Sequence, residues 1–246
     1  MNLNEITFKE VNRQDVLDML LKKHYLHRMP PLSFAYGAYY NDELVGCLTF
    51  GKPASNSLCR GVCGDSYEKY VIELNRLYTN DNTPRNTESK LIAYGLNKLK
   101  QKGDFIIISY ADKNMSHSGY VYQATNWIYT GHTISRTDVY VGAKGHSKKY
   151  TEEQKNFVVR AMRSVKHRYI YIVGNKRFKK EILKNIKYPI IEQYPKEKPC
   201  HYSDNDGDNK MLYHKITKQV FSENEFLSHP EKFLSKEELK KFNEIY

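Results

Sequence analysis

The chain has 246 residues, of which 40% are hydrophobic and 27% are charged, a composition typical of a globular protein with a sizeable core. No apolar run reaches the length of about eighteen residues that a membrane span needs, and the first residues do not resemble a secretion signal. We therefore expect a soluble, cytoplasmic protein with no membrane partner. The formal net charge of +11, from 39 basic and 28 acidic residues, favours a polyanionic partner, most often nucleic acid.

The four cysteines are expected to be free thiols. In a chain without a secretion signal, a disulfide framework is not expected. Cys59 and Cys63 could form half of a zinc site, with Cys200 and His201 as the other half. Their spacing matches none of the usual zinc templates. The remaining cysteine is Cys47.

The N-terminal part of the chain predicts an edge strand, a helix and a hairpin. Ile6–Val11 alternates apolar and charged residues, as an edge strand does. Asn12 can cap a helix whose apolar residues recur at helical spacing and which ends near Lys23. Phe34–Tyr40 and Leu44–Phe50 predict two strands joined by an Asn-Asp turn.

A polar loop separates that helix from the hairpin. Pro30 and Pro31 prevent the helix from continuing. Polar side chains on such a loop are available for chemistry, and a solvated turn is the alternative. The loop carries His24, Tyr25, His27 and Arg28.

The middle of the chain predicts a loop, a central strand and a helix. The segment 51–66 has small residues and two cysteines and is expected to be a loop. Val71–Thr79 predicts a central strand, and a polar loop then leads into a helix with Thr87 as its candidate cap. The buried face of this helix is expected to contain Ile92, Leu96 and Leu99.

The stretch from Phe105 to Gly131 carries the strongest candidate site. Its first four residues, up to Ile108, predict a buried strand, and a helix is expected from about Ser116. Ligands of α/β sheets bind beyond the carboxyl ends of strands, where Asp112 stands. From the residues alone, an aspartate that caps the next helix is an equal alternative.

The second half predicts further strands and helices. Thr133–Gly142 and Arg168–Val173 predict strands, and a basic helix begins at Lys176, with Ile182, Leu183 and Ile186 directed inward. From Tyr194 the chain becomes rich in proline and charge, as a linker is. The tail predicts a strand from Met211 and a short amphipathic helix, Lys236–Ile245. The element order predicts an α/β protein with a mixed sheet, with one domain over 1–195 and a C-terminal extension over 196–246.

The sequence resembles two protein families. The strand, loop and helix of 73–96, followed by Tyr122, resemble the core of GNAT acyltransferases, with Asn126 and Trp127 in place of the family's Gly-Phe pair. The sequences ELNRL (73–77), SYAD (109–112) and YQATNWIYTG (122–131), with an HY pair before them, are similar to the Mom family over about 22–195. The resemblance implies a GNAT-like acyltransferase fold. It also implies a phage-type enzyme that adds a methylcarbamoyl group to the exocyclic amine of adenine in DNA and so protects DNA from restriction.

The resemblance also implies catalytic residues. The Mom functional positions correspond here to His24, Tyr25, Asp112 and Tyr122. Asp112 would accept the amine proton or orient the amine, and Tyr122 would protonate the leaving group. His24 and Tyr25 would bind an adenine that has left the base stack. Because His and Asp side chains also bind metals, a metal ion stays an open alternative.

The GNAT resemblance implies acetyl-CoA or a related acyl-CoA as cofactor. In that family, the loop after the fourth strand holds the coenzyme pyrophosphate on backbone amides at a helix N-terminus. The usual glycines are missing from this loop, and Arg85 could compensate by pairing with phosphate. The residues expected to bind the cofactor are Leu77, Tyr78, Thr79, Arg85, Asn86, Thr87, Glu88, Ser89 and Asn126.

Basic residues supply the expected contact to double-stranded DNA, and their phosphate contacts would weaken with salt. The residues expected to bind DNA are Arg28, Arg136, Lys144, Lys148, Lys149, Arg163 and Lys166. Two other functions stay open. One is an ordinary GNAT acyltransferase acting on a small-molecule, protein or RNA amine, and the other is a basic DNA-binding protein without catalysis. The expected partners are DNA and an acyl donor, in the host cytoplasm if the chain is phage-encoded, and a homodimer is left open.

Overall fold

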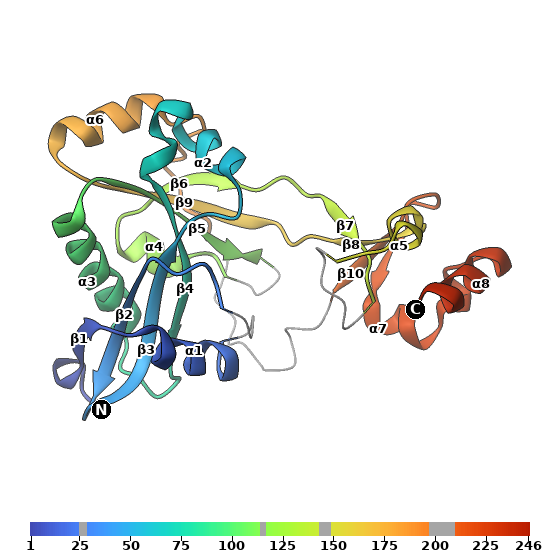
Figure 1. Ribbon diagram of the computed structural model, residues 1–246, viewed down its shortest axis with the longest axis horizontal. Helices are drawn as coiled ribbons and strands as arrows, with labels where there is room; N and C mark the ends of the chain where they lie inside the picture. Colours follow the sequence, from blue (N-terminus) through green and yellow to red (C-terminus); the bar gives the residue numbers. More distant parts are fainter. Residues whose placement is uncertain (25–28, 114–116, 143–148, 197–209) are drawn as a thin grey trace. The chain divides into compact units, whose positions relative to one another are not determined.

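The computed structural model describes residues 1–24, 29–113, 117–142, 149–196 and 210–246. The chain divides into two compact units (Figure 1). Unit 1 consists of Met1–His132 and Lys166–Cys200, and unit 2 consists of Thr133–Val165 and His201–Tyr246. Within the described ranges, no helix is both long and apolar enough to cross a membrane.

Unit 1 is built on a seven-stranded mixed sheet with the order β1-β2-β3-β4-β5-β9-β6. The pair β4–β5 is parallel, and the other neighbours are antiparallel. The expected α/β fold with a mixed sheet is therefore confirmed. The strands are β1 (Thr7–Glu10), β2 (Phe34–Tyr40), β3 (Glu43–Gly51), β4 (Val71–Thr79), β5 (Phe105–Asp112), β6 (Ile128–His132) and β9 (Lys166–Val173).

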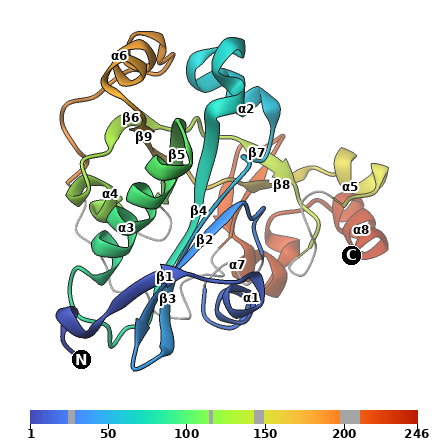
Figure 2. The same cartoon turned by 60° about the vertical axis from the view of Figure 1, so that its left-hand side comes forward.

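Helices cover both faces of this sheet (Figure 2). The long helix α3 packs Leu91, Ile92 and Leu99 against one face, and Tyr122 of α4 belongs to the same core cluster. Helices α1, α2 and α6 pack against the opposite face. The helical elements of unit 1 are η1 (Leu3–Glu5), α1 (Arg13–Lys22), α2 (Asn56–Cys63), η2 (Asp65–Tyr70), α3 (Thr87–Lys102), α4 (Tyr120–Ala124) and α6 (Lys176–Asn185).

Most of the elements predicted for unit 1 are confirmed. Asn12 caps α1, as expected, by accepting a hydrogen bond from the Asp15 backbone N–H at 3.0 Å. The hairpin turn is also confirmed, because Asn41 and Asp42 have φ values of 48° and 62°. Both central residues of a type I′ hairpin turn need such positive values, and Asn and Asp tolerate them.

Three local predictions for unit 1 are wrong. The expected loop 51–66 contains α2, which Ser55 caps and which buries Cys59 and Cys63 on one side. With eight residues, α2 is shorter than the window of about 11–18 residues over which helical periodicity is recognised in a sequence. Thr87 is the first residue of α3 and not its cap. Leu183 of α6 is 45% exposed instead of inward, because Phe178 and Ile182 form the buried stripe.

Unit 2 contains a four-stranded antiparallel sheet with the order β11-β10-β8-β7. The predicted strand at Met211 and the predicted helix Lys236–Ile245 are confirmed. Residues 133–165, which the sequence pattern placed with the first domain, group instead with the tail because β8 pairs with β10. The elements are β7 (Thr137–Val139), α5 (Glu152–Asn156), β8 (Val159–Met162), β10 (Met211–His214), β11 (Val220–Ser222), α7 (Glu223–Ser228), η5 (Pro230–Lys232) and α8 (Lys236–Ile245).

Candidate active site

The candidate site begins where the two parallel strands separate. β4 and β5 pair only from Val71–Glu73 to Ile106–Ile108. Beyond this point β4 continues to pair with β3, and β5 continues to pair with β9. The Ser109 hydroxyl donates to the carbonyl oxygen of Leu74 across the opening, at 2.8 Å. The carboxyl ends of β4 and β5 thus diverge, and such a point is where α/β sheets bind ligands.

A β-bulge in β4 lies at the same level. Thr49 of β3 pairs with Arg76, and the next residue, Phe50, pairs with Leu74, so Asn75 is the extra residue. The Asn75 amide donates to the Pro31 carbonyl oxygen at 2.8 Å and accepts from the Thr49 hydroxyl at 2.6 Å. Bulges bend a strand and occur often next to active sites. This one bends β4 where it leaves β5.

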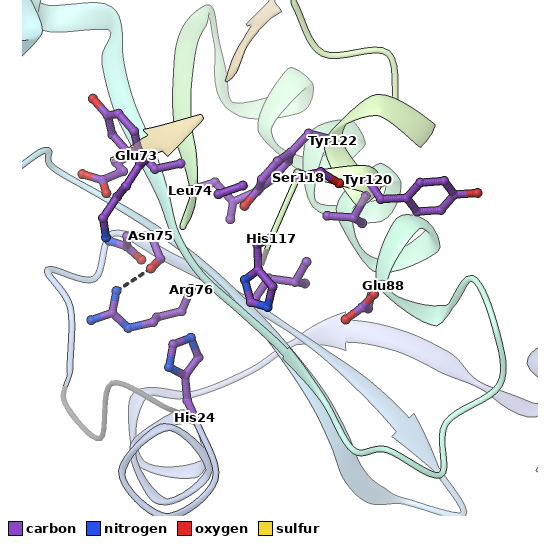
Figure 3. A pocket seen from close by; sticks show the side chains of 16 residues that line it. His24, Glu73, Leu74, Asn75, Arg76, Glu88, His117, Ser118, Tyr120 and Tyr122 are labelled. Carbon is purple, nitrogen blue, oxygen red and sulfur yellow. Dashed lines mark hydrogen bonds between the residues drawn. The ribbon is translucent and has the colours of Figure 1, made fainter. Parts of the chain in front are cut away.

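A cavity of about 400 Å³ fills the space between the separated strands (Figure 3). This volume falls in the range of about 300–1,000 Å³ typical of small-molecule sites. Its wall combines β4, β5, the segment before α4 and α4 itself. The lining residues are His24, Glu73, Leu74, Asn75, Arg76, Leu77, Glu88, Tyr110, Ala111, His117, Ser118, Gly119, Tyr120, Val121, Tyr122 and Lys166.

Tyr122, the predicted proton donor, lines this cavity. Its side chain is 7% exposed, and its ring lies 5.1 Å from the rings of both Trp127 and Tyr169. Its hydroxyl is 2.8 Å from the Ser109 hydroxyl. Ser109 has one hydrogen, and the Leu74 carbonyl can only accept. Ser109 therefore donates either to Tyr122 or to Leu74, and when it donates to Leu74 its oxygen can accept from the Tyr122 hydroxyl; in both cases the direction of the phenol hydroxyl is fixed.

The turn after α4 explains the unusual residues that follow Tyr122. Asn126 has a φ of 59°, in the left-handed region that glycine favours and asparagine tolerates. Asparagine is therefore compatible with the backbone conformation that this turn requires. Trp127 is fully buried and forms one side of the Tyr122 pocket. Asn126, predicted to bind the cofactor, is not among the residues that line the cavity.

The backbone before α4 leaves no room for a side chain at Gly119. Gly119 has a φ of 80°, and a Cβ atom there would lie 2.4 Å from the Tyr169 ring. We expect Gly119→Ala to lower the free energy of unfolding by about 1–3 kcal/mol, because the ring and α4 must shift. Gly142→Ala is the matched control, since Gly142 has the same φ (80°) but no atom closer than 3.4 Å to its added Cβ. Urea unfolding of both variants tests this, and equal losses would contradict the steric argument.

Glu73 is the carboxylate that faces this cavity from the central strand. Its burial raises its pKa, and the positive charges of Arg76 and Lys166 partly offset the rise. A carboxylate with a raised pKa is a suitable general base near neutral pH. The sequence analysis used Glu73 only as part of the ELNRL motif and did not assign it a role. A carboxylate on an otherwise buried central strand was the available signal.

The raised pKa of Glu73 predicts a pH-dependent stability difference. Between its unfolded pKa, about 4.3, and its higher folded pKa, the folded chain binds more protons than the unfolded chain. Its stability therefore falls as pH rises through this window. We expect Glu73→Gln to raise the melting temperature relative to wild type more at pH 7 than at pH 4. The exposed Glu43→Gln serves as control, and a difference that is constant with pH would refute the shift.

Asp112 lies beside the cavity but is not among its lining residues. It is 9% exposed, and its carboxylate pairs with the Lys166 ammonium at 3.0 Å. Its backbone oxygen accepts from the His117 N–H at 3.0 Å. Lys166, predicted to contact DNA, lines the cavity, and its ion pair holds the Asp112 carboxylate beside the cavity wall. The catalytic role of Asp112 stays a prediction.

The N-terminal loop reaches the cavity through His24, which is 5% exposed and lines its wall. Figure 3 shows His24 beside Arg76, with His117 nearer to Glu88 in this view. Arg76 is also buried, and it donates to the Asn75 carbonyl oxygen. Sequence reasoning assigned no role to Arg76 or His117. The predicted residues Tyr25 and Arg28 lie outside the described residues.

The predicted cofactor loop reaches the cavity only at its two ends, Leu77 and Glu88. Asn86 adopts a left-handed conformation with a φ of 72°, and no side chain caps α3 there. The first N–H of this 16-residue helix, that of Thr87, donates to the Pro84 carbonyl oxygen at 3.2 Å, so a phosphate there would be met by the next N–H groups, of Glu88 and Ser89. Glu88 accepts from the Thr79 hydroxyl at 3.4 Å. The other predicted residues of this loop, which do not line the cavity, are Tyr78, Thr79, Arg85, Asn86, Thr87 and Ser89.

The predicted DNA-binding residues are distributed over both units. In unit 2, Arg136 and Lys149 are exposed, and Arg163 pairs with Asp138 at 3.0 Å. Lys144 and Lys148 lie outside the described residues. Arg168 belongs to β9, where its guanidinium lies 3.4 Å from the centre of the Tyr188 ring. Arg168 is therefore part of the packing in unit 1.

The cysteines and the metal alternative were also compared with the structure. Cys47, Cys59 and Cys63 are free and buried, as expected, whereas Cys200 and His201 are not described. Within the described ranges, no three His, Cys, Asp or Glu side chains are arranged to hold a metal ion. A metal requirement therefore stays an open prediction.

Comparison with known proteins places this architecture in context. A family model described as the Mom protein family matches residues 5–196. Methylcarbamoylase mom of Escherichia phage Mu is 29% identical over 191 residues, which cover 71% of this chain and 77% of the relative. Among solved structures, an N-acetyltransferase from Staphylococcus aureus Mu50 matches with a TM-score of 0.42 and 13% identity, covering 69% of this chain and 99% of that one. A Bacillus subtilis acetyltransferase in complex with CoA matches with a TM-score of 0.39 and 16% identity, covering 68% and 96%. No residue is equated with either structure at these scores.

Proposed function

The chain belongs to the Mom protein family, and we propose that it is a transferase that adds a methylcarbamoyl group to the exocyclic amine of adenine in DNA. One observation carries the proposal. The cavity at the separated strands brings together Tyr122, Glu73 and His24 within the part of the chain that the family model matches. The phage Mu relative, named as a methylcarbamoylase, supports the chemistry.

The reaction needs a base because the lone pair of the adenine amine is delocalised into the ring. The amine nitrogen forms a new bond to the transferred carbon, and the bond between that carbon and the leaving group breaks. Glu73 accepts the amine proton, since its carboxylate faces the cavity and burial raises its pKa. Asp112, paired with Lys166, orients groups at the edge of the same site. This refines the expectation that Asp112 is the base.

Tyr122 supplies the proton for the leaving group. Its hydroxyl is fixed by Ser109 and by two flanking rings, so the phenol has a defined direction. Proton donation of this kind typically contributes about 10²–10⁴-fold to the rate. The group that leaves takes the phenol proton, and solvent returns a proton to Tyr122 after release.

The adenine must leave the base stack before it can enter the cavity. His24 and Arg76 are buried polar groups of the cavity wall and provide hydrogen-bonding partners for the edge of a base. The neighbouring Lys166 adds positive charge that suits the nucleotide phosphate. Together these groups favour a nucleotide over an uncharged amine as substrate.

The proposed donor is a coenzyme A thioester that carries the methylcarbamoyl group itself, so the bond that breaks is the one to sulfur and the coenzyme A thiolate is the leaving group. The uncapped N-terminus of α3 fits its pyrophosphate, and Leu77 and Glu88 border the route from that helix to the cavity. The negative charge of the Glu88 carboxylate would repel the pyrophosphate, so the positive charge of Arg85 has to offset that repulsion. Calorimetry with coenzyme A tests this part, and Arg85→Ala should weaken binding.

Protection from restriction tests the function in cells. Plasmid DNA from cells that express the chain should resist restriction enzymes whose sites contain adenine. Enzymes whose sites contain only G and C should cut the same DNA normally. If both classes cut equally well while the purified protein still binds DNA, the alternative of a basic DNA-binding protein without catalysis is favoured. If coenzyme A binds and DNA does not, an ordinary GNAT acyltransferase is favoured.

A further inference from the structure

The sheet of unit 2 has two different faces. Val159, Leu212 and Phe221 point to one face, where Phe226 of α7 and Phe242 of α8 complete an apolar core. Side chains alternate along a strand, so the residues between them point to the opposite face. We call this opposite face the outer face of unit 2. By strand register it consists of Thr137, Val139, Arg160, Met162, Met211, Tyr213, Val220 and Ser222, with Lys215 two residues beyond Tyr213. Val139 is buried, so the accessible part is centred on Arg160, Tyr213, Lys215 and Val220.

On the outer face, one row of paired residues crosses all four strands. Val139 pairs with Arg160, Arg160 with Tyr213, and Tyr213 with Val220. Lys215 follows two residues after Tyr213, and its backbone N–H still bonds to β8, at the Val158 carbonyl oxygen. Lys215 therefore lies on the same side as Arg160 and Tyr213.

The outer face is positively charged. Its residues include no acid, and among the described residues no carboxylate lies within ion-pair distance of Arg160, Lys215 or Lys218. Burial and the nearby charge of Arg160 lower the pKa of Lys215, so the two cations are close enough to repel each other. Arg160 donates to the Lys155 backbone carbonyl at 3.5 Å, and Lys215 donates to that of Asn156 at 3.4 Å. Like charges held together in this way suit a polyanion.

The outer face also presents surface for contact with sugars or bases. Tyr213 is half-buried, and the Lys218 ammonium lies 5.8 Å from the centre of its ring. Val220 is 49% exposed. A flat sheet face that combines cations with an aromatic ring matches the way in which proteins bind nucleic acid strands.

We propose that the outer face of unit 2 binds the sugar-phosphate backbone of DNA. This inference rests on the proposed function, in which DNA is the substrate. Two of its four strands, β10 and β11, belong to the tail beyond residue 196, where the family model ends. The tail thus adds a binding surface to this chain. The surface holds the DNA, and the cavity of unit 1 performs the chemistry.

The proposal is tested by the salt dependence of DNA binding by the full chain. Fluorescence anisotropy is measured with a labelled short duplex for wild type and for the double variant Arg160→Ala, Lys215→Ala. Each lost phosphate contact lowers the slope of log affinity against log salt by about 0.9, so the double variant should lose about 1.8. Its affinity should fall on the order of tenfold.

The matched control is the double variant Lys240→Ala, Lys241→Ala, which removes the same charge from exposed positions of α8. It should bind like wild type. The charge-preserving double variant Arg160→Lys, Lys215→Arg should keep the salt slope, which excludes a folding defect as the cause. Equal slopes for both alanine variants would overturn the proposal, and so would tighter binding to RNA than to DNA. The measurement requires no catalysis, so it is independent of whether an adenine adduct forms.

Discussion

Replacing Tyr122 by phenylalanine should lower the rate of adenine modification on the order of 10²-fold or more, with the fold retained. The change removes only the hydroxyl, which lies 2.8 Å from Ser109. The ring keeps its packing against Trp127 and Tyr169. The rate is measured by single-turnover modification of duplex DNA.

Ser109→Ala is the control for the Tyr122 experiment. It removes the hydrogen-bonding partner of the phenol but leaves the acid in place. The net value of one hydrogen bond is about 0.5–1.5 kcal/mol, so this variant should lose no more than about tenfold. If Tyr122→Phe retains the wild-type rate, the phenol is not the acid.

Replacing Trp127 by alanine should cause the largest loss of stability, about 3–5 kcal/mol in the free energy of unfolding. Trp127 is fully buried, and its ring lies 5.1 Å from Tyr122 and 5.5 Å from Tyr171. The substitution would also remove one wall of the pocket around Tyr122, so activity should fall in parallel. Urea unfolding followed by circular dichroism gives the loss.

Trp127→Phe tests the reason for that loss. The indole N–H is buried, and within the described residues it has no hydrogen-bonding partner. Phenylalanine keeps most of the apolar contact and removes this unpaired donor. It should therefore cost much less than alanine. A loss as large as that of the alanine variant would show that the indole itself is required.

The sequence was sufficient to predict the elements with strong periodicity. The hairpin around Asn41, the central strand β4 and the helix α3 were all expected near their observed bounds. The helix α2 was missed because its eight residues are too few for helical periodicity to be recognised in the sequence. The grouping of 133–165 with the tail was missed because strand pairing between distant segments leaves no local pattern.

The candidate site was partly predictable. The family motif pointed to Tyr122 and His24, and both line the cavity. Arg76 and Glu73 were missed, since their position depends on the bulge at Asn75 and on the separation of β4 from β5. A register shift in a sheet is a property of two strands together, so one strand's sequence does not reveal it.

The mass of deoxyadenosine in DNA from cells that make this chain tests the account most directly. DNA is digested to nucleosides and compared between cells that make wild type and cells that make equal amounts of the Tyr122→Phe variant. The account predicts a deoxyadenosine adduct with wild type that is nearly lost with the variant, and no adduct on the other three nucleosides. Unmodified deoxyadenosine in cells that make folded wild type would contradict it.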